Sequence, residues 1–268
     1  MADAGVRIWF QSAVEMDSAG PYRESLGRQF RQVVHAATVV DVHGVPAGTW
    51  GGQQPSALFG YPAVFLAVLG PAFLRNAARA EREGYDAFIV GTFIEPFLRE
   101  LRSAVHIPVV SSLEATLLVG CTAAQTIGLV TINSALRHSL RTSIERHRLA
   151  ARVGPILTMD PELDETAAVA LLADPAAGCA RFAAVARQAV AAGADAIIPA
   201  ESILATLTSR EKLYEADGAA VLDAIGIPAA FAEMLVGLSR HAGLRTGRRW
   251  HTPRPPAKML DLFLSRLP

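Results

Sequence analysis

Short apolar runs alternate along the chain with longer segments in which apolar residues recur at helical spacing. Strands are expected at residues 7–12, 38–45, 87–91, 107–111, 126–133, 153–159 and 196–200. Helices are expected at 22–36, 59–83 with a break at Gly70–Pro71, 114–124, 135–147, 180–192 and, after the short run 227–230, to about residue 241. Strands that alternate with helices imply parallel pairing through right-handed crossovers, so the predicted fold class is α/β.

Two of these strands belong to a repeated pattern. Residues 84–92 read Gly-Tyr-Asp-Ala-Phe-Ile-Val-Gly-Thr, and residues 193–201 read Gly-Ala-Asp-Ala-Ile-Ile-Pro-Ala-Glu. A single Gly-x-Asp-Ala before a strand is ordinary turn chemistry, with glycine at the preceding helix end. The apolar run that follows is continuous in both copies, which is typical of parallel strands covered on both faces. The repeat predicts two equivalent strands that end at Thr92 and at Glu201.

The repetition extends beyond these strands. An Ile-Pro pair and then a glutamate follow each copy, at Ile107, Pro108 and Glu114 and again at 227, 228 and 233. Because the same Ile-Pro pair and glutamate follow both copies, a duplicated half is favoured over two independent turns. We expect one half to consist of residues 1–112 together with 230–268, and the other half of residues 113–229.

The overall composition excludes several classes of function. The 268-residue chain carries 25 Lys and Arg against 25 Asp and Glu, so neither nucleic acid nor a membrane surface is expected as a partner. Its two cysteines make no disulfide framework, and no CxxC or HExxH spacing indicates a metal site. The N-terminal residues show no signal-like segment, and the apolar stretch 61–73, interrupted at Gly70–Pro71, is too short to span a bilayer. A cytoplasmic protein that acts on a small molecule is expected.

Candidate site residues follow from the sheet topology, because open parallel sheets bind ligands beyond the carboxyl ends of their strands. The polar residues at the expected strand ends are Gln11, Ser12, His43, Thr92, Ser111, Ser112, Asn133, Ser134, Glu201 and Ser202. Each of them could instead be an ordinary helix cap or turn residue.

The chain resembles the aspartate/glutamate/hydantoin racemase superfamily over most of its length. The resemblance is carried by residues 85–96, 107–115, 127–133 and 194–201, and by Gly-Leu-Arg-Thr at 243–246 before a proline-rich tail. It implies two pseudo-symmetric, Rossmann-like α/β halves with the active site in the cleft between them. It also implies chemistry without a cofactor, and together with the tail it favours a homo-oligomer.

The chain departs from this family at the two positions that carry its chemistry. Racemases of the family place one cysteine at each of two matched strand ends, where this chain has Thr92 and Glu201. Cys121 and Cys179 lie elsewhere and are expected to be small buried apolar residues. A threonine hydroxyl is too weak an acid to serve as a base near neutral pH, but it can donate a hydrogen bond to an oxyanion. Glu201 can act as a general acid or base.

Four kinds of function fit this pair of residues. The favoured one is an isomerisation in which Glu201 moves a proton next to a carbonyl while Thr92 stabilises the enolate. A decarboxylation or carbon–carbon lyase reaction would pass through a similar enolate, and some relatives in the superfamily are decarboxylases that retain one cysteine. Glu201 could also activate water to hydrolyse a cyclic amide or imide. The remaining alternative is a binding protein without catalysis.

Substrate contacts are expected, by the resemblance and by position, from Gln11, Ser12, Thr131, Asn133 and Ser202. No arginine stands at an expected strand end, which disfavours a dicarboxylate substrate. His43 is an alternative acid or base, or else an ordinary loop histidine. Trp50 lies in a glycine-rich loop that could close over the cleft or pack on the surface.

Overall fold

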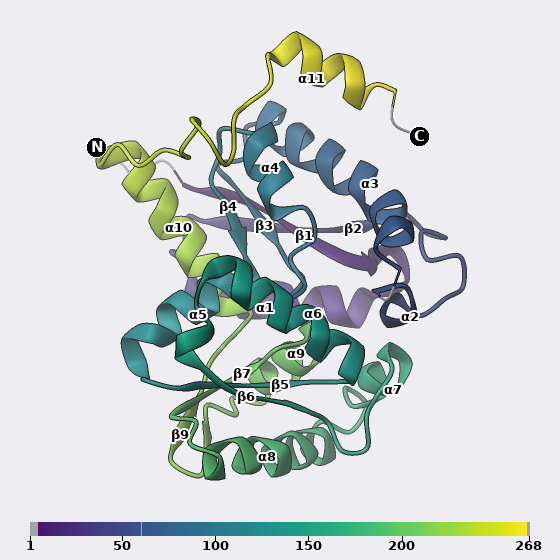
Figure 1. Ribbon diagram of the computed structural model, residues 1–268, viewed down its shortest axis with the longest axis vertical. Helices are drawn as coiled ribbons and strands as arrows, with labels where there is room; N and C mark the ends of the chain where they lie inside the picture. Colours follow the sequence, from purple (N-terminus) through teal and green to yellow (C-terminus); the bar gives the residue numbers. More distant parts are fainter. Residues whose placement is uncertain (1–4, 60, 267–268) are drawn as a thin grey trace.

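Two sheets with parallel strands at their centres form the framework of the molecule (Figure 1), seen in a computed structural model that describes residues 5–59 and 61–266. The first sheet has the order β2 (Val39–Val45), β1 (Arg7–Glu15), β3 (Ala87–Val90) and β4 (Val109–Ser111). The second has the order β6 (Val153–Thr158), β5 (Ile127–Thr131), β7 (Ala196–Pro199), β9 (Ala219–Val221) and β8 (Glu215–Ala216). All strand pairs are parallel except β8 with β9. The first four positions of both sheets follow the same chain order, which confirms the α/β class and the two related halves.

Helices surround both sheets. Those that follow the strands of the first sheet are α1 (Gly20–Val33), α2 (Pro55–Phe59), α3 (Pro62–Arg82), α4 (Leu98–Ala104) and α5 (Ser112–Ala123). The later ones are α6 (Ser134–His147), α7 (Glu165–Ala170), α8 (Pro175–Ala191), α9 (Ser202–Arg210), α10 (Gly226–His241) and α11 (Ala257–Leu264). Two short 3-10 turns, Met16–Ser18 and Ala150–Arg152, complete the regular structure. After the second sheet the chain returns to the first, because α10 packs on β3 and β4 and α11 lies on α3 (Figure 1).

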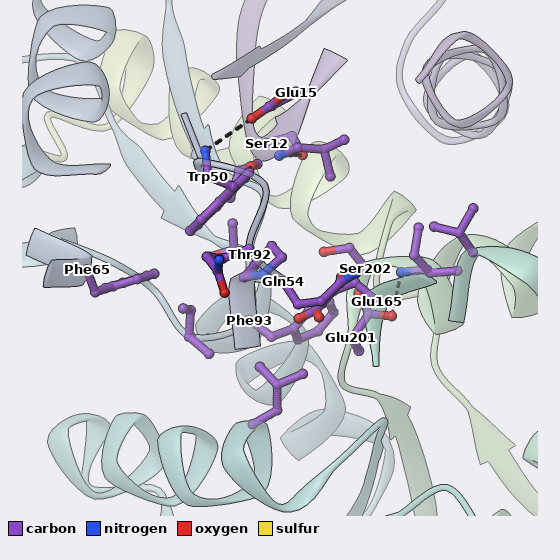
Figure 2. A pocket seen from close by; sticks show the side chains of 18 of the residues that line it. Ser12, Glu15, Trp50, Gln54, Phe65, Thr92, Phe93, Glu165, Glu201 and Ser202 are labelled. Carbon is purple, nitrogen blue, oxygen red and sulfur yellow. Dashed lines mark hydrogen bonds between the residues drawn. The ribbon is translucent and has the colours of Figure 1, made fainter. Parts of the chain in front are cut away.

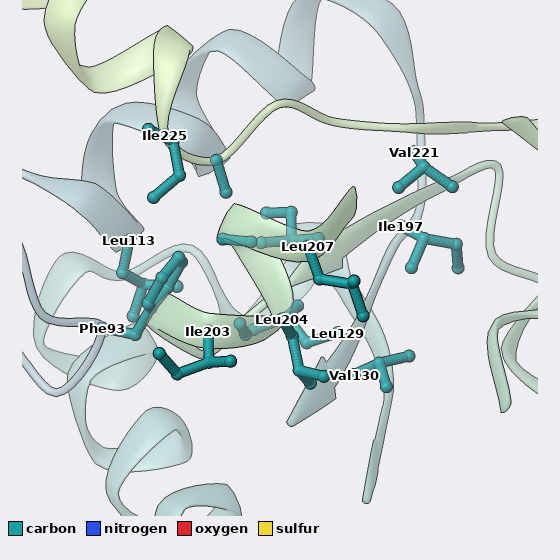
Figure 3. Packing of buried hydrophobic residues seen from close by; sticks show 14 of the residues in the cluster. Phe93, Leu113, Leu129, Val130, Ile197, Ile203, Leu204, Leu207, Val221 and Ile225 are labelled. Carbon is teal, nitrogen blue, oxygen red and sulfur yellow. The ribbon is translucent and has the colours of Figure 1, made fainter. Parts of the chain in front are cut away.

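The continuous apolar strands are explained by burial on both faces. In β3, Ala87 and Ile89 face one hydrophobic cluster, whereas Phe88 and Val90 face another beneath α3 and α4. The first cluster continues without interruption into the second sheet. Figure 3 shows Phe93 of the first half packed among second-half residues. The two halves therefore share one core.

The prediction that the repeat marks two equivalent strands is confirmed, and its aspartates explain why. The backbone N–H of Arg7 donates to Asp86 Oδ2 at 2.8 Å, and the N–H of Thr126 donates to Asp195 Oδ2 at 3.0 Å. In return the N–H of each aspartate donates to the carbonyl of the same residue, at 2.7 Å and 2.8 Å. Each aspartate thus holds the start of the neighbouring central strand, and it sets the register of β1 with β3 and of β5 with β7. The glycine two residues before it has a positive φ in both copies.

The expected extension of the repeat is wrong. The Ile-Pro pair at 107–108 leads into β4, but its counterpart at 227–228 lies in the first turn of α10. Proline is tolerated there because the first N–H groups of a helix have no intrahelical partner. The second-half strand equivalent to β4 is β9, which a hairpin joins to β8 through Asp217 and Gly218. Both turn residues have positive φ, the conformation for which Asp-Gly is the standard hairpin sequence.

The expected break in the third helix is also wrong, because α3 runs through Gly70 and Pro71 without interruption. Its face with Leu69, Phe73 and Ala77 is fully buried against the first sheet, and this burial holds the helix together despite the proline. The uninterrupted helix is long and apolar enough to cross a membrane by length and composition, so the argument that this stretch is too short does not hold.

The two cysteines also differ from expectation. Cys121 lies within α5, and Cys179 lies inside α8, which begins at Pro175 and not near residue 180. Both side chains are partly buried and pack at the margin of the shared core.

Candidate active site

A cavity of about 540 Å³ lies between the two halves, beyond the carboxyl ends of β1, β3 and β7 (Figure 2). Residues from distant segments line it, among them Ser12, Glu15, Trp50, Gln54, Phe65, Thr92, Phe93, Leu136, Glu165, Glu201 and Ser202. The cavity therefore includes both strand-end residues of the repeat, Thr92 from the first half and Glu201 from the second.

Glu201 is positioned by the start of α9. Its Oε2 accepts hydrogen bonds from the backbone N–H groups of Ile203 at 2.7 Å and Leu204 at 3.0 Å. Burial raises the pKa of Glu201 to about 7, although these two N–H groups act in the opposite direction, and the nearby charge of Glu165 contributes to the rise. A carboxyl group with a pKa near neutrality can both accept and donate a proton under ordinary conditions.

Thr92 follows β3 directly after Gly91. Its side chain is buried, and Oγ1 has no hydrogen-bond partner among the described residues. Gly91 allows the close approach, because a Cβ atom at this position would lie 2.3 Å from the ring of Phe10. The carbonyl of Gly91 accepts a hydrogen bond from Ser202 Oγ at 3.3 Å. This bond ties the two strand ends together in the cavity wall, while the buried Thr92 hydroxyl keeps an unused hydrogen-bonding capacity.

A tyrosine hydroxyl behind Glu201 was missed by the sequence reasoning. Tyr22 of α1 is buried, and its hydroxyl has no partner that meets hydrogen-bond geometry among the described residues. Burial raises its pKa well above the usual range, and the charge of Glu201 adds to the shift. The hydroxyl therefore stays protonated, near those of Ser12 and Ser202. In the sequence Tyr22 looks like an ordinary core position, four residues before Leu26 on the apolar face of a helix.

The carboxylates Glu15 and Glu165 also line the cavity and were not expected there. Glu15 Oε1 accepts from the backbone N–H of Trp50 at 3.1 Å, and the indole N–H of Trp50 donates to Ala13 O at 3.0 Å. Trp50 is only 7% exposed, so its loop forms part of the cavity wall. Glu165 accepts from both the N–H and the hydroxyl of Ser56, at 2.8 Å and 2.9 Å, and joins α7 to α2.

Gln11 does not line the cavity, because other protein groups occupy its amide. Its Nε2 donates to the carbonyls of Ser12 and Gly44 at 2.9 Å and 3.0 Å. Its Oε1 accepts from Trp9 Nε1 at 3.0 Å and Asn76 Nδ2 at 2.9 Å. Of the two first-strand residues expected to bind substrate, the structure therefore brings only Ser12 to the site.

Three further candidates lie outside the cavity lining. His43 stacks on Trp9 with ring centroids 3.4 Å apart, and burial lowers its pKa. Asn133 caps α6, accepting from Leu136 N at 3.1 Å and donating to Leu163 O at 2.9 Å. The Thr131 hydroxyl is buried within the second sheet. The cap interpretation of Asn133 is the one that the structure shows, whereas Ser202 does line the cavity.

The cavity carries acidic groups without basic ones. Among its described lining residues, Glu15, Glu165 and Glu201 are acidic and none is Lys, Arg or His. Trp50, Phe65, Phe93 and several aliphatic side chains supply most of the remaining wall. Within the described part of the chain, no three His, Cys, Asp or Glu side chains converge as a metal site would require. The site is thus largely apolar with a few hydroxyl and carboxyl groups, and its three acidic residues disfavour anions.

Comparisons with known proteins agree with this architecture. A family model for Asp/Glu/hydantoin racemases matches residues 66–226, more than half of the chain, and that family is one of isomerases. Allantoin racemase from Klebsiella pneumoniae is similar in structure, with a TM-score of 0.72, 19% identity and 94% of each chain covered. Allantoin racemase from Pseudomonas fluorescens gives a TM-score of 0.71 at 19% identity, over 93% of this chain and 97% of that one.

A more distant likeness is to the maleate isomerase from Pseudomonas putida S16, with a TM-score of 0.54 and 16% identity over 88% of this chain and 93% of that one. At these identities the structural likeness establishes the fold, and the sequence match establishes the family. No curated protein sequence matches the chain. With the fold, the paired strand ends and the matched segment in agreement, the chain belongs to the Asp/Glu/hydantoin racemase family of enzymes.

Proposed function

We propose that this enzyme isomerises a small, uncharged polar carbonyl compound by moving a proton at the carbon next to the carbonyl, without a cofactor. Glu201 is the acid–base group, and Thr92 is the hydrogen-bond donor to the enolate oxygen. The observation that carries the proposal is a carboxyl group with a pKa of about 7, located at the strand end where relatives have their second cysteine.

The geometry of Glu201 suits a proton carrier. Its Oε2 is held by two backbone N–H groups, so Oε1 is the oxygen left to exchange a proton with the substrate. Removal of the proton places negative charge on the carbonyl oxygen, and the unpartnered Thr92 hydroxyl can donate to that oxygen. Ser12 supplies a further hydroxyl on the lining, whereas the hydroxyl of Ser202 donates to the Gly91 carbonyl. Because Glu201 is a single acid–base group on one side of the enolate, inversion requires the enolate to turn over within the cavity before Glu201 returns the proton, with no atom gained or lost.

The charge of the cavity favours an uncharged substrate. An anionic substrate would meet three glutamates and no cation among the described lining residues. This counts against dicarboxylates and substituted malonates, and therefore against the decarboxylase alternative. Two structural neighbours are allantoin racemases, and allantoin is an uncharged cyclic ureide that bears a hydrogen next to a carbonyl. Allantoin and 5-methylhydantoin are therefore the probes to test first.

The test is exchange of the substrate hydrogen in heavy water. Single enantiomers of both probes are incubated with the wild-type enzyme, with Glu201→Gln and with a control, Glu145→Gln, at an exposed glutamate of α6. The proposal expects deuterium at the ring carbon and loss of optical rotation with the wild type and the control, and neither with Glu201→Gln. A gain of one water would instead identify a hydrolase. Unchanged turnover by Glu201→Gln would refute the role of this residue.

A further inference from the structure

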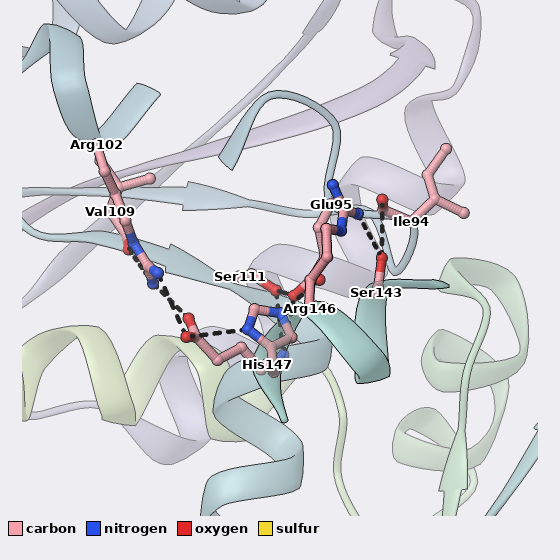
Figure 4. Close-up of polar contacts among 9 residues, drawn as sticks. Ile94, Glu95, Arg102, Val109, Ser111, Ser143, Arg146 and His147 are labelled. Atoms are coloured by element: carbon pink, nitrogen blue, oxygen red, sulfur yellow. Dashed lines mark hydrogen bonds and ion pairs between the residues drawn. The ribbon is translucent and has the colours of Figure 1, made fainter. Parts of the chain in front are cut away.

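A buried polar cluster outside the cavity joins the two halves (Figure 4). Its centre is Glu95, which is 1% exposed. Glu95 Oε2 lies 2.6 Å from His147 Nε2 at the end of α6. Glu95 Oε1 accepts from the hydroxyl of Ser111 and from the backbone N–H of Glu114 at 3.2 Å. Both oxygens of this buried carboxylate thus have hydrogen-bond partners, and these partners come from α6, β4 and α5.

The charges around His147 keep its ring protonated. Nδ1 of His147 lies 3.4 Å from Glu114 Oε1, so the imidazole stands between two carboxylates. Hydrogen bonds to Glu114 and Glu95 raise the pKa of His147 to about 9 against the effect of burial. Position at the C-terminus of α6 also favours a cation. The other charged groups at the cluster are Arg102, which binds Glu114, and Arg146, which donates to Ser143 Oγ at 2.8 Å.

The cluster includes a residue of the segment that carries Thr92. Glu95 lies three residues after Thr92, and its N–H donates to the Thr92 carbonyl at 3.3 Å. Glu95 and Phe97 both have positive φ, at 53° and 58°, which is a strained conformation for residues other than glycine. Such a backbone persists only where its surroundings hold it. The Thr92 side chain is buried and its hydroxyl has no hydrogen-bond partner among the described residues, so its place depends on packing and on the backbone that carries it.

We propose that His147 and Glu95 form a positioning pair that fixes Thr92 relative to Glu201. The pair connects the two halves, since Glu95 follows a strand of the first sheet whereas His147 ends a helix of the second half. The same helix lines the cavity at its other end with Leu136. This inference rests on the proposed role of Thr92. Neither His147 nor Glu95 lines the cavity, so the pair acts through the loop and not on the substrate.

The test compares His147→Gln, which keeps an N–H donor but loses the charge, with His138→Gln at an exposed histidine of the same helix. Amide hydrogen exchange is measured across the chain, and kcat and KM are measured with 5-methylhydantoin. His147→Gln should raise exchange selectively in residues 91–97. It should also lower kcat on the order of 100-fold with little change in KM, because a small misplacement of a donor affects the transition state most. The control should change neither quantity.

Two results would overturn the inference. The first is that His147→Gln and the control show the same amide hydrogen exchange in residues 91–97 and the same kcat. The second is that His147→Gln raises amide hydrogen exchange evenly over the whole chain. If His147→Gln does not fold, the wild type is studied between pH 7 and 10. Loss of the imidazolium should then raise exchange of residues 91–97, corrected for base catalysis, above that of other loops, and an unchanged loop would refute the pair. If the wild type does not turn over the probe, the proposed function fails, and hydrogen exchange alone decides this inference.

Discussion

Replacing Glu201 by glutamine should stabilise the fold at alkaline pH while abolishing turnover. The pKa of Glu201 is about 7 in the folded enzyme, against an ordinary value of 4.5. The folded state therefore binds a proton more readily than the unfolded state, and the contribution of Glu201 to stability falls as pH rises from 4.5 through 7. A rise of this size corresponds to about 3 kcal/mol of destabilisation once the group is ionised.

Glutamine removes this cost but keeps an acceptor oxygen for the N–H groups of Ile203 and Leu204. The opposing effect of the helix N-terminal N–H groups on the ionised carboxylate is already contained in the pKa of about 7. We therefore expect Glu201→Gln to be about 3 kcal/mol more stable than the wild type at pH 8.5. Near pH 5 the difference should fall to roughly 1 kcal/mol, since the folded wild type is then protonated and only the unfolded chain has begun to ionise.

The assay is equilibrium unfolding in urea at pH 5 and pH 8.5, with Glu145→Gln as the exposed control. The informative quantity is the change, between the two pH values, in the free energy of unfolding of the variant relative to the wild type. If this relative stability is the same at both pH values, the folded-state pKa is not raised. Glu201 would then be an ordinary helix cap, and the reasoning that makes it an acid–base group would be refuted.

The remaining predictions concern the surroundings of the site. Thr92→Val should lower kcat roughly 100-fold, as loss of an oxyanion donor does, without loss of stability in urea, because its hydroxyl has no protein partner; an unchanged kcat would contradict its role. His147 has a pKa raised to about 9, so the stability that the wild type holds over His147→Gln should be complete below pH 6.5 and disappear as pH rises through 9, followed by urea unfolding. Gly91→Ala should cost about 1–3 kcal/mol because its methyl group would meet the ring of Phe10. Gly237→Ala, in α10 with open space around it, should instead be slightly stabilising, and equal effects would contradict the packing argument.

Much of the fold could be predicted because its signals are local. The glycine of each repeat copy ends a helix, and the apolar run after it records burial on both faces, whereas the backbone partner of each aspartate lies far away in the sequence. The two Ile-Pro pairs were expected to be equivalent, but they are not. The same two residues suit both the approach to a strand and the first turn of a helix. The β8–β9 hairpin was missed although Asp217 and Gly218 carry its turn signature, because two very short strands leave little periodicity to detect.

The site could be predicted only in part. Thr92 and Glu201 emerged because each follows a strand of the repeat. Three other residues come from elements that meet only in the folded chain. They are Glu15 at the end of β1, Tyr22 in α1 and Glu165 in α7. Nothing in their local sequence separates them from surface or core residues. Conversely, Asn133 sits at a strand end yet serves as a helix cap, because strand ends in α/β folds are also helix starts.

In each repeat copy, the residue that anchors the strand is not the residue that faces the cavity. Asp86 and Asp195 fix their strands from the opposite end, some six residues before the position that faces the cavity. The side chain at that position does not hold the strand in place. A change of side chain at residue 92 or 201 therefore leaves these strand anchors intact, and each half can change without the other. The two strand ends that the repeat matches are thus free to differ, and in this chain one carries a hydroxyl and the other a carboxyl group.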